Sequence, residues 1–169
     1  AIYFANFDDL STDAIVYDAT NTDTIDTWVP AAQLSLFKYE LKSNENSFTT
    51  AVQTSRDNGT TFFEQTLSIS LKKQDQAMHK NIKLLAYGRP RIIIRTMTDQ
   101  FFLMGLAQGC DTTAGEISSG AAMGDFNGYK LTFVASEVLP ANFIDASTEA
   151  ALKTAFADSV GADASIVTS

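Results

Sequence analysis

The segment TFFEQTLSISL, residues Thr61 to Leu71, constrains the fold of this chain more than any other stretch. One parity of the segment is apolar and the other is mainly polar, a period of two that is typical of a half-buried strand. The apolar face of such a strand must be covered by another element. The amphipathic segment Asp75 to Tyr87 follows directly, so we predict that it provides this cover. The apolar positions of the strand are Phe63, Leu67, Ile69 and Leu71.

The size and composition of the chain indicate one domain with one core. The chain has 169 residues, 45% of them apolar, and twelve Phe residues supply bulky core material. The one cysteine, Cys110, excludes an internal disulfide and favours a reducing compartment. We expect Cys110 to be a small buried or loop residue, because a catalytic thiolate needs a neighbouring base.

No apolar run approaches the length of about 20 residues that a membrane span needs. The N-terminus lacks the basic and apolar regions of a signal peptide. We therefore expect a soluble protein without membrane contact.

The net charge of −8 is unevenly distributed along the sequence. Residues 1–30 carry six Asp and no Lys or Arg, whereas residues 70–95 carry seven Lys or Arg against Asp75. A basic belt therefore lies between acidic ends. It is either a set of solvated faces or a surface that meets an acidic surface of a second copy.

Residues 1–30 are predicted to form an acidic N-terminal arm. The arm has little periodicity but holds many large apolar groups, among them Ile2, Phe4, Ile15 and Trp28, too many for a free tail. It packs either on its own domain or on a neighbouring copy.

Three strands in meander order are predicted after the arm. Gln33 to Leu41 and Phe48 to Thr54 alternate or are rich in β-branched residues, and Thr61 to Leu71 is the third strand. Residues 43–46 form the first turn. Asn58-Gly59 favours a type I′ turn for the second hairpin, because both residues tolerate a positive φ.

Residues 73–87 are predicted to be a helix, with Met78, Ile82 and Leu85 on one face. Asp75 is a candidate cap, and Gly88 and Pro90 end the helix. His79 stands alone on it, which supports neither metal nor base chemistry. The helix lysines fit a solvated or subunit-facing surface better than a nucleic-acid site, because no aromatic platform interleaves with them.

The second half of the chain is predicted to contain further strands, a glycine-punctuated passage and a last helix. The passage, Cys110 to Phe126, lacks a phosphate-loop pattern, and its glycines predict turns, bulges and close approach of neighbouring chain segments. Gly161 to Ser169 either frays or docks on a partner. The predicted strands are Arg91 to Met97, Phe101 to Leu106 and Tyr129 to Val138, and the helix is Thr148 to Ser159, capped by Ser147 or Thr148.

No constellation of residues points to catalysis or to a cofactor. The chain has one His and one Cys, and it lacks the HExxH, paired-cysteine and Ser/His/Asp patterns. Acidic neighbours such as Asp8-Asp9 are no acid/base pair without enforced geometry. We therefore expect a non-enzymatic protein with no catalytic residue, no metal and no cofactor.

The order of elements over residues 31–144 resembles the tail tube proteins of tailed bacteriophages. A meander of strands leads into FEQTLSISLKKQDQAMHKNIKLLAYGRPRIIIRTMTDQFFLMGL, where strand, short helix, strand and the Phe101 to Leu106 arm follow one another. The glycine-rich Gly115 to Gly124 passage and the GDFNGY sequence then lead into a last strand ending at Glu137 and Pro140. Residues 1–30 and 145–169, the C-terminal helix and tail, lie outside the resemblance.

The resemblance implies a mainly β, α+β subunit: an antiparallel β-sandwich or barrel-like body with a flanking helix and an extended N-terminal arm. Such subunits assemble into hexameric rings whose inner sheets join into a larger β-barrel, and the rings stack into a conduit for DNA ejection. The partners would be other copies of the chain and other tail proteins. DNA would pass without specific binding, and the protein would lie in the virion tail after assembly in the host cytoplasm.

A DNA conduit needs a wall that does not hold phosphate, which acidic and neutral polar side chains provide. Candidates for the lumen wall on or near the meander are Glu40, Glu45, Asp57 and Glu64. Candidates for subunit contacts in the basic belt are Lys80, Lys83, Arg89 and Arg91.

Three other interpretations stay open, one of them an enzyme of unrecognised type. A related tail ring, baseplate or neck protein would share the same elements. A β-sandwich module that binds a carbohydrate or a host surface would expose aromatic side chains on a cluster of loops.

Overall fold

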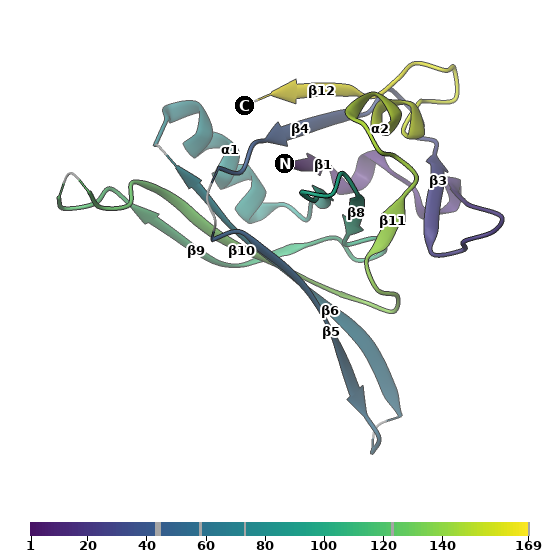
Figure 1. The fold of residues 1–169 in the computed structure, drawn as a ribbon, viewed down its shortest axis with the longest axis horizontal. Coiled ribbons are helices and arrows are strands. Elements are labelled where there is room, and N and C mark those ends of the chain that lie inside the picture. Colours follow the sequence, from purple (N-terminus) through teal and green to yellow (C-terminus); the bar gives the residue numbers. More distant parts are fainter. Residues whose placement is uncertain (43–44, 58, 73, 123, 169) are drawn as a thin grey trace.

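The computed structural model describes residues 1–42, 45–57, 59–72, 74–122 and 124–168. The chain is mainly β, with 45% of residues in strands, 15% in helices, and two sheets. Figure 1 shows a body that carries both sheets and a long hairpin that leaves it. The predicted β-rich α+β class is confirmed.

The larger sheet draws its strands from the whole length of the chain. Its order is β12-β4-β1-β7-β8-β11-β3-β2, and β1 lies between β4 and β7. Its members are β1 (Ile2–Ala5), β2 (Ile15–Tyr17), β3 (Thr24–Trp28), β4 (Ser35–Tyr39), β7 (Arg91–Arg95), β8 (Phe101–Met104), β11 (Asn142–Ile144) and β12 (Ser165–Thr168).

The smaller sheet has the order β5-β6-β10-β9 and is antiparallel throughout. Its members are β5 (Ser47–Ser55), β6 (Thr60–Lys72), β9 (Asp111–Ser118) and β10 (Gly128–Glu137). The alternation predicted for the two central strands is confirmed, because Leu67 and Ile69 on β6 and Leu131 and Phe133 on β10 are buried. The glycine-punctuated passage, however, contains strand β9, which the prediction missed.

Two α-helices flank the sheets. Helix α1 (Gln76–Tyr87) agrees with the predicted helix, and α2 (Glu149–Ala155) ends four residues before the predicted end. The side chain of Thr148 accepts a hydrogen bond from Ala151 N, so Thr148 is the cap of α2. Short 3-10 helices at Phe7–Asp9 and Thr12–Ala14 follow β1.

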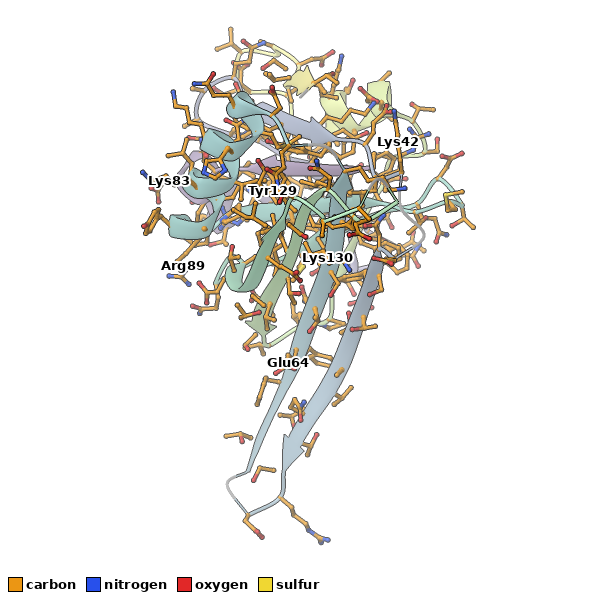
Figure 2. The ribbon with its side chains drawn as sticks, turned by 90° about the vertical axis from the view of Figure 1, so that its left-hand side faces the viewer. Lys42, Glu64, Lys83, Arg89, Tyr129 and Lys130 are labelled. Carbon is orange, nitrogen blue, oxygen red and sulfur yellow. The ribbon has the colours of Figure 1, made fainter. Side chains whose placement is uncertain are left out.

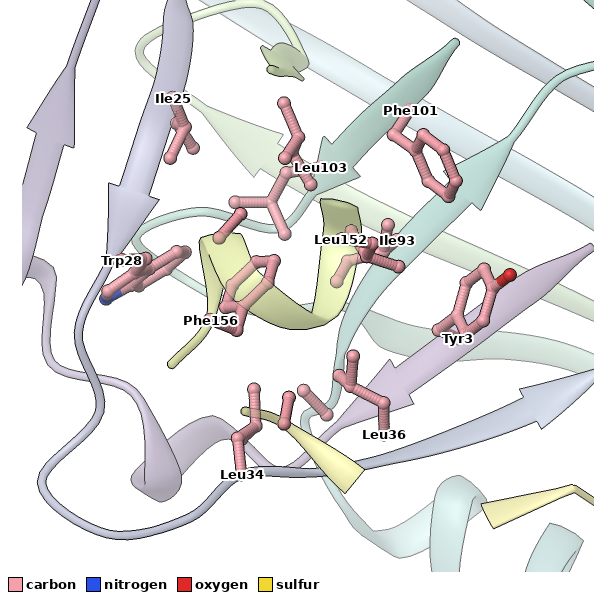
Figure 3. Close-up of a cluster of buried hydrophobic side chains, with 14 of the residues drawn as sticks. Tyr3, Ile25, Trp28, Leu34, Leu36, Ile93, Phe101, Leu103, Leu152 and Phe156 are labelled. Carbon is pink, nitrogen blue, oxygen red and sulfur yellow. The ribbon is translucent and has the colours of Figure 1, made fainter. Parts of the chain in front are cut away.

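One hydrophobic cluster holds α2 against the larger sheet. Leu152 and Phe156 are fully buried beside Trp28, whose ring centroid lies 6.1 Å from that of Phe156. Figure 3 shows these side chains together with residues from several strands. Burying each such side chain contributes roughly 1.5–3 kcal/mol to stability.

A second cluster lies on the other side of β1 and β7 and joins the two sheets. Ile2 and Ile92 from the larger sheet pack there with Leu67 and Phe133 from the smaller sheet. The predicted cover for β6 was therefore incomplete, since the larger sheet also packs against its apolar face and α1 contributes Ile82 to the same cluster. The packing of one sheet on another joins segments that are far apart in the sequence, so local sequence patterns cannot predict it.

The structure corrects two predictions about the chain's organisation and decides between two alternatives for a third. Strand β4 pairs with β1 and β12 instead of β5, so the three-strand meander is wrong. The N-terminal residues pack on their own chain, with β1 inside the sheet, which selects one of the two alternatives for the arm. The expected fraying or partner docking of the C-terminal segment is wrong for β12, because residues 165–168 pair in parallel with β4 of the same chain.

The expected boundaries at residues 30 and 144 therefore separate no packing units, because β1, β4 and β12 lie side by side in one sheet. Asn58 of the predicted type I′ turn, Ser43 and Asn44 of the preceding turn, and Lys73 at the predicted helix start lie outside the described residues. Within the described residues, no helix has both the length and the apolar character that crossing a bilayer requires.

Candidate assembly surface

The smaller sheet has one face in the core and one face directed away from it. Cross-strand partners share a face, so the registers place Thr49, Thr66 and Thr132 together on the outward face, opposite the buried Leu67 and Leu131. Other outward positions are mostly small and polar: Ser47, Ala51, Gln53, Ser68, Ala114 and Ser136. The charged residues on this face are Glu64, Lys72, Asp111, Glu116 and Lys130, so acidic side chains outnumber basic ones.

The two edge strands of this sheet are exposed. In the described chain β5 pairs with β6, β9 pairs with β10, and neither has a second strand beside it. Residues 49–54 of β5 are all exposed, and its nine residues SFTTAVQTS include no charge and no proline. Charges, prolines and bulges are the usual devices that keep an exposed edge from pairing with another chain.

The strands of the smaller sheet are staggered. β6 pairs with β5 over Thr60–Ser68 and with β10 over Phe63–Lys72, while β9 reaches β10 over residues 128–134. Successive strands are therefore displaced along the strand direction. A closed barrel requires such a stagger together with a tilt of its strands.

The β5–β6 hairpin projects well beyond the body. Figures 1 and 2 show its far half leaving the rest of the molecule, with Glu64 on the projecting part in Figure 2. Val52 and Phe62 on this hairpin are 61% and 38% exposed. A two-stranded ribbon with exposed apolar groups is marginally stable by itself, so this hairpin is a natural contact element.

The four carboxylates proposed for a lumen wall do not lie on one face. Glu64 is on the outward face of β6, and Glu45 lies 3.4 Å from Lys130 of the same face. Asp57 follows β5 at the tip of the hairpin. Glu40 lies 3.6 Å from Lys38, whose ammonium also bonds Glu149 of α2, on the far side of the larger sheet. The grouping assumed the meander, which the structure does not form.

The four candidate contact cations also separate into two kinds. Lys80 and Lys83 are exposed on α1, and Arg89 is half exposed with its Nε 3.8 Å from Asp111. Arg91 is 2% exposed and therefore cannot serve as a surface contact. The sequence pattern of arginines around an apolar run did not distinguish these environments.

Arg91 is held inside the fold by its own chain. Its Nη1 donates to the carbonyl oxygens of Phe7 and Leu10 at 2.6 Å, and its Nε donates to that of Leu106 at 3.0 Å. The guanidinium carbon lies 4.2 Å from the Phe7 ring centroid and 5.0 Å from that of Trp28. Burial lowers the pKa of Arg91, but arginine stays protonated at any ordinary pH.

Glu137 and Cys110 are buried near Arg91 and are satisfied by the backbone. Glu137 Oε1 accepts hydrogen bonds from Ala107 N and Gln108 N, while burial raises the pKa of its carboxyl. Cys110 is fully buried, as expected, and burial raises the pKa of its thiol strongly. Both groups fix the turn after β8 through these hydrogen bonds and that from Cys110 Sγ to Met104 O.

The part of the chain that the structure describes contains no group of three or more His, Cys, Asp or Glu that could hold a metal ion. Its clefts are shallow grooves beside the helices and strands. One of about 550 Å³ lies between α1 and β1, and one of about 430 Å³ lies between α1 and the edge strand β9. The second groove involves Tyr87 and Ile117, which the sequence analysis did not single out; the β-branched Thr112, Thr113 and Ile117 were the available signal for β9.

The fold and this surface define a β-rich protein with an open-edged sheet. Comparisons with protein-family models, with curated proteins and with solved structures found no match.

Proposed function

We propose that this protein is a structural subunit of a virion tail, of the tail-tube type. It assembles with copies of itself into stacked rings, which the family resemblance makes hexameric, and the rings form a conduit for DNA ejection. Other tail proteins are its further partners, and it performs no catalysis. The observation that carries the proposal is a four-stranded sheet with two open edges and a polar outward face.

The open edges argue for a second copy. An exposed, uncharged edge of nine residues such as β5 would pair with other chains without control in a protein that acts as a monomer. Pairing β5 of one copy with β9 of the next satisfies both edges and ends only when the ring closes. Closure thus turns an aggregation hazard into a defined assembly.

The strand directions support this closure. β5 is antiparallel to β6, β6 to β10, and β10 to β9, so β5 and β9 of one subunit run in opposite directions. Rotation about a ring axis preserves those directions, and β5 of one copy would meet β9 of the next in antiparallel fashion. The joined sheet therefore continues the same pattern, and the stagger of its strands suits a tilted barrel.

The outward face of the sheet suits a lumen for DNA. Its charged side chains in register are Glu64, Lys72, Asp111, Glu116 and Lys130, and Glu45 lies beside Lys130, so carboxylates outnumber the two lysines. Ser and Thr hydroxyls make up much of the rest. Such a wall offers little of the lysine and arginine contact that releases counterions from DNA, so a duplex can slide past it.

Size and shape in solution test the proposal. We expect light scattering after size-exclusion chromatography to show multiples of the 18.3 kDa chain that grow with concentration, and negative-stain microscopy to show rings or tubes. Retention of duplex DNA on the assembled material at low salt is expected to be negligible. A chain that stays monomeric across a thousandfold range of concentration would contradict the proposal.

The carbohydrate-binding alternative receives no specific support. The exposed aromatic side chains among the described residues are Tyr17 on β2, Phe62 on β6, Tyr87 on α1 and Phe143 on β11. They lie on four separate elements instead of one cluster of loops.

A further inference from the structure

A groove runs between helix α1 and the edge strand β9. It has a volume of about 430 Å³, and the helix lines it with the apolar side chains of Ile82, Ala86 and Tyr87 and also with His79 and Lys83. Ile117 of β9 and Leu131 of β10 line it from the sheet. Tyr87 is 83% exposed and Ile117 is 53% exposed, so the groove leaves apolar surface in contact with water.

The groove opens beside the unpaired edge of β9. A strand that added to this edge would place every second side chain on the core side of the sheet, where α1 lies, and the others on the outward face. The added strand would therefore need apolar or small side chains at one parity and small polar ones at the other. It would also have to be free of charge on the groove side, because burying an unpaired charge there is costly.

Strand β5 of a second copy meets these requirements. Its registers with β6 place Thr50, Val52 and Thr54 on the core side, opposite Gln65, Phe63 and Thr61. All three are exposed because this part of the hairpin lies beyond the body. The opposite parity carries Thr49, Ala51 and Gln53, which match the polar outward face.

The charges on the two sides of the molecule are complementary as well. The α1 side carries the exposed Lys80 and Lys83, and the β2–β3 side carries the acidic residues Asp23 and Asp26. Figure 1 shows α1 and β9 at the left of the molecule, β3 at the right of the body, and the β5–β6 hairpin projecting below the body. Copies arranged head to tail with these two sides facing each other therefore bring opposite charges together.

We propose that the α1–β9 groove is the socket that receives the Thr50, Val52 and Thr54 side chains of β5 from a neighbouring copy. This inference rests on the proposed assembly and adds which side chains enter the groove and which parity of β5 faces away. The helix then has a function in the contact, because it closes the socket over the incoming strand.

A cysteine scan along β5 tests the socket. Each residue from Thr49 to Thr54 is replaced singly by cysteine in a chain that also carries Ala86→Cys in the groove. Cys110 stays in place, since a fully buried thiol of raised pKa does not react. Disulfide-linked dimers and ladders after mild oxidation are measured by non-reducing electrophoresis, with Ala86→Cys alone as the reference.

The expected pattern is alternation. Cysteines at 50, 52 or 54 should give at least fivefold more linked material than those at 49, 51 and 53, which face the other way. Rings or tubes without such alternation, or with linkage from the opposite parity, would overturn the socket and leave the proposed function intact. Failure of the parent chain to assemble would overturn both.

Discussion

The guanidinium of Arg91 ties together backbone segments that are far apart in the sequence. It bonds the carbonyl oxygens of Phe7 and Leu10 after β1, and that of Leu106 after β8. Its charge is compensated by carbonyl dipoles and by the faces of two aromatic rings. Its position on the central strand β7 thus anchors the turn that follows β1.

Replacing Arg91 with methionine is expected to destabilise the fold by about 3 kcal/mol. The new side chain keeps the apolar stem but leaves three carbonyl oxygens without this donor, and each buried unsatisfied group costs roughly 1–3 kcal/mol. Urea denaturation followed by circular dichroism measures the loss. The matched control is Arg89→Met, which removes a half-exposed side chain and is expected to cost under about 1 kcal/mol. Equal effects of the two substitutions would contradict the role of Arg91.

The Lys38–Glu149 pair links β4 to α2. Lys38 Nζ donates to Glu149 Oε2 at 2.8 Å, and the Tyr3 hydroxyl donates to the same oxygen at 3.4 Å. The hydrogen bond from Lys38 lowers the pKa of Glu149 below its ordinary value of 4.5. The pair therefore stabilises the fold above that value, and its contribution is lost as the pH falls through the lowered pKa.

The variant Glu149→Gln should accordingly be less stable than the parent at pH 7, by about 1 kcal/mol for a partly exposed charged hydrogen bond. The difference should shrink as the pH drops below 4.5 and vanish once Glu149 is protonated in the folded parent. Denaturation curves of both proteins at several pH values measure this difference. A difference in unfolding free energy that stays constant from pH 7 to pH 3 would show that the charge of Glu149 does not stabilise the fold.

At the scale of elements, the start of β10 depends on a glycine. Gly128 has a φ of +158° and lies opposite Lys72 in the β6–β10 pair. A Cβ added there would lie 2.0 Å from the carbonyl oxygen of Leu71. The close approach of the two strands at this end of the sheet therefore excludes any side chain.

The substitution Gly128→Ala is expected to destabilise the protein by roughly 2–4 kcal/mol, because backbone must move apart to admit the methyl group. Gly124→Ala in the same connection is the control, since a Cβ there meets nothing within 4 Å. Thermal unfolding of both variants measures the contrast. If the two midpoints agree, the close approach does not constrain this end of the sheet.

Periodicity explains which elements could be predicted. β6, β10 and α1 bury one face and expose the other, so their apolar residues repeat at two or at about 3.6 positions. β9 lies on an edge with mostly exposed side chains and has no apolar repeat. β12 is held by backbone pairing with β4, and its sequence GADASIVTS carries no signal for a parallel partner.

At the scale of the whole molecule, the projecting hairpin and the groove beside β9 lie on different sides of the body. A contact that joins them must be made between copies. Assembly is therefore expected to depend on the far half of β5. The fold of the single chain is expected to form without it. This separation allows assembly and stability to be measured independently.

The substitution Val52→Lys should weaken assembly at least tenfold in concentration, because a positive charge would enter a mainly apolar socket that Lys83 also lines. The single chain should keep its stability within about 0.5 kcal/mol, since Val52 is 61% exposed. Val160→Lys, at a position 90% exposed near the C-terminus, has the same change in charge and should assemble like the parent. Light scattering and denaturation report the two properties, and unimpaired assembly of Val52→Lys would contradict the role of β5.

The candidate surface was predictable only in part. Glu64 on the outward face followed from its parity in β6, and the exposure of Lys80 and Lys83 followed from the helical repeat. The grouping of Glu40 with the other carboxylates failed, because β4 crosses to the larger sheet. Arg91 was predicted to be a surface cation. Its burial could not be predicted, because its three backbone acceptors come from residues that only folding brings near it.

The sequence by itself determined the β-rich class, the two best-patterned strands, both helices and the cap of α2 within one residue, because local periodicity and capping chemistry act between near neighbours. The tertiary structure alone decided that β1, β4 and β12 share one sheet and that β5 and β9 are the open edges of another. Those pairings depend on hydrogen bonds and apolar contacts between segments up to about the full chain apart, for which adjacent residues carry no pattern.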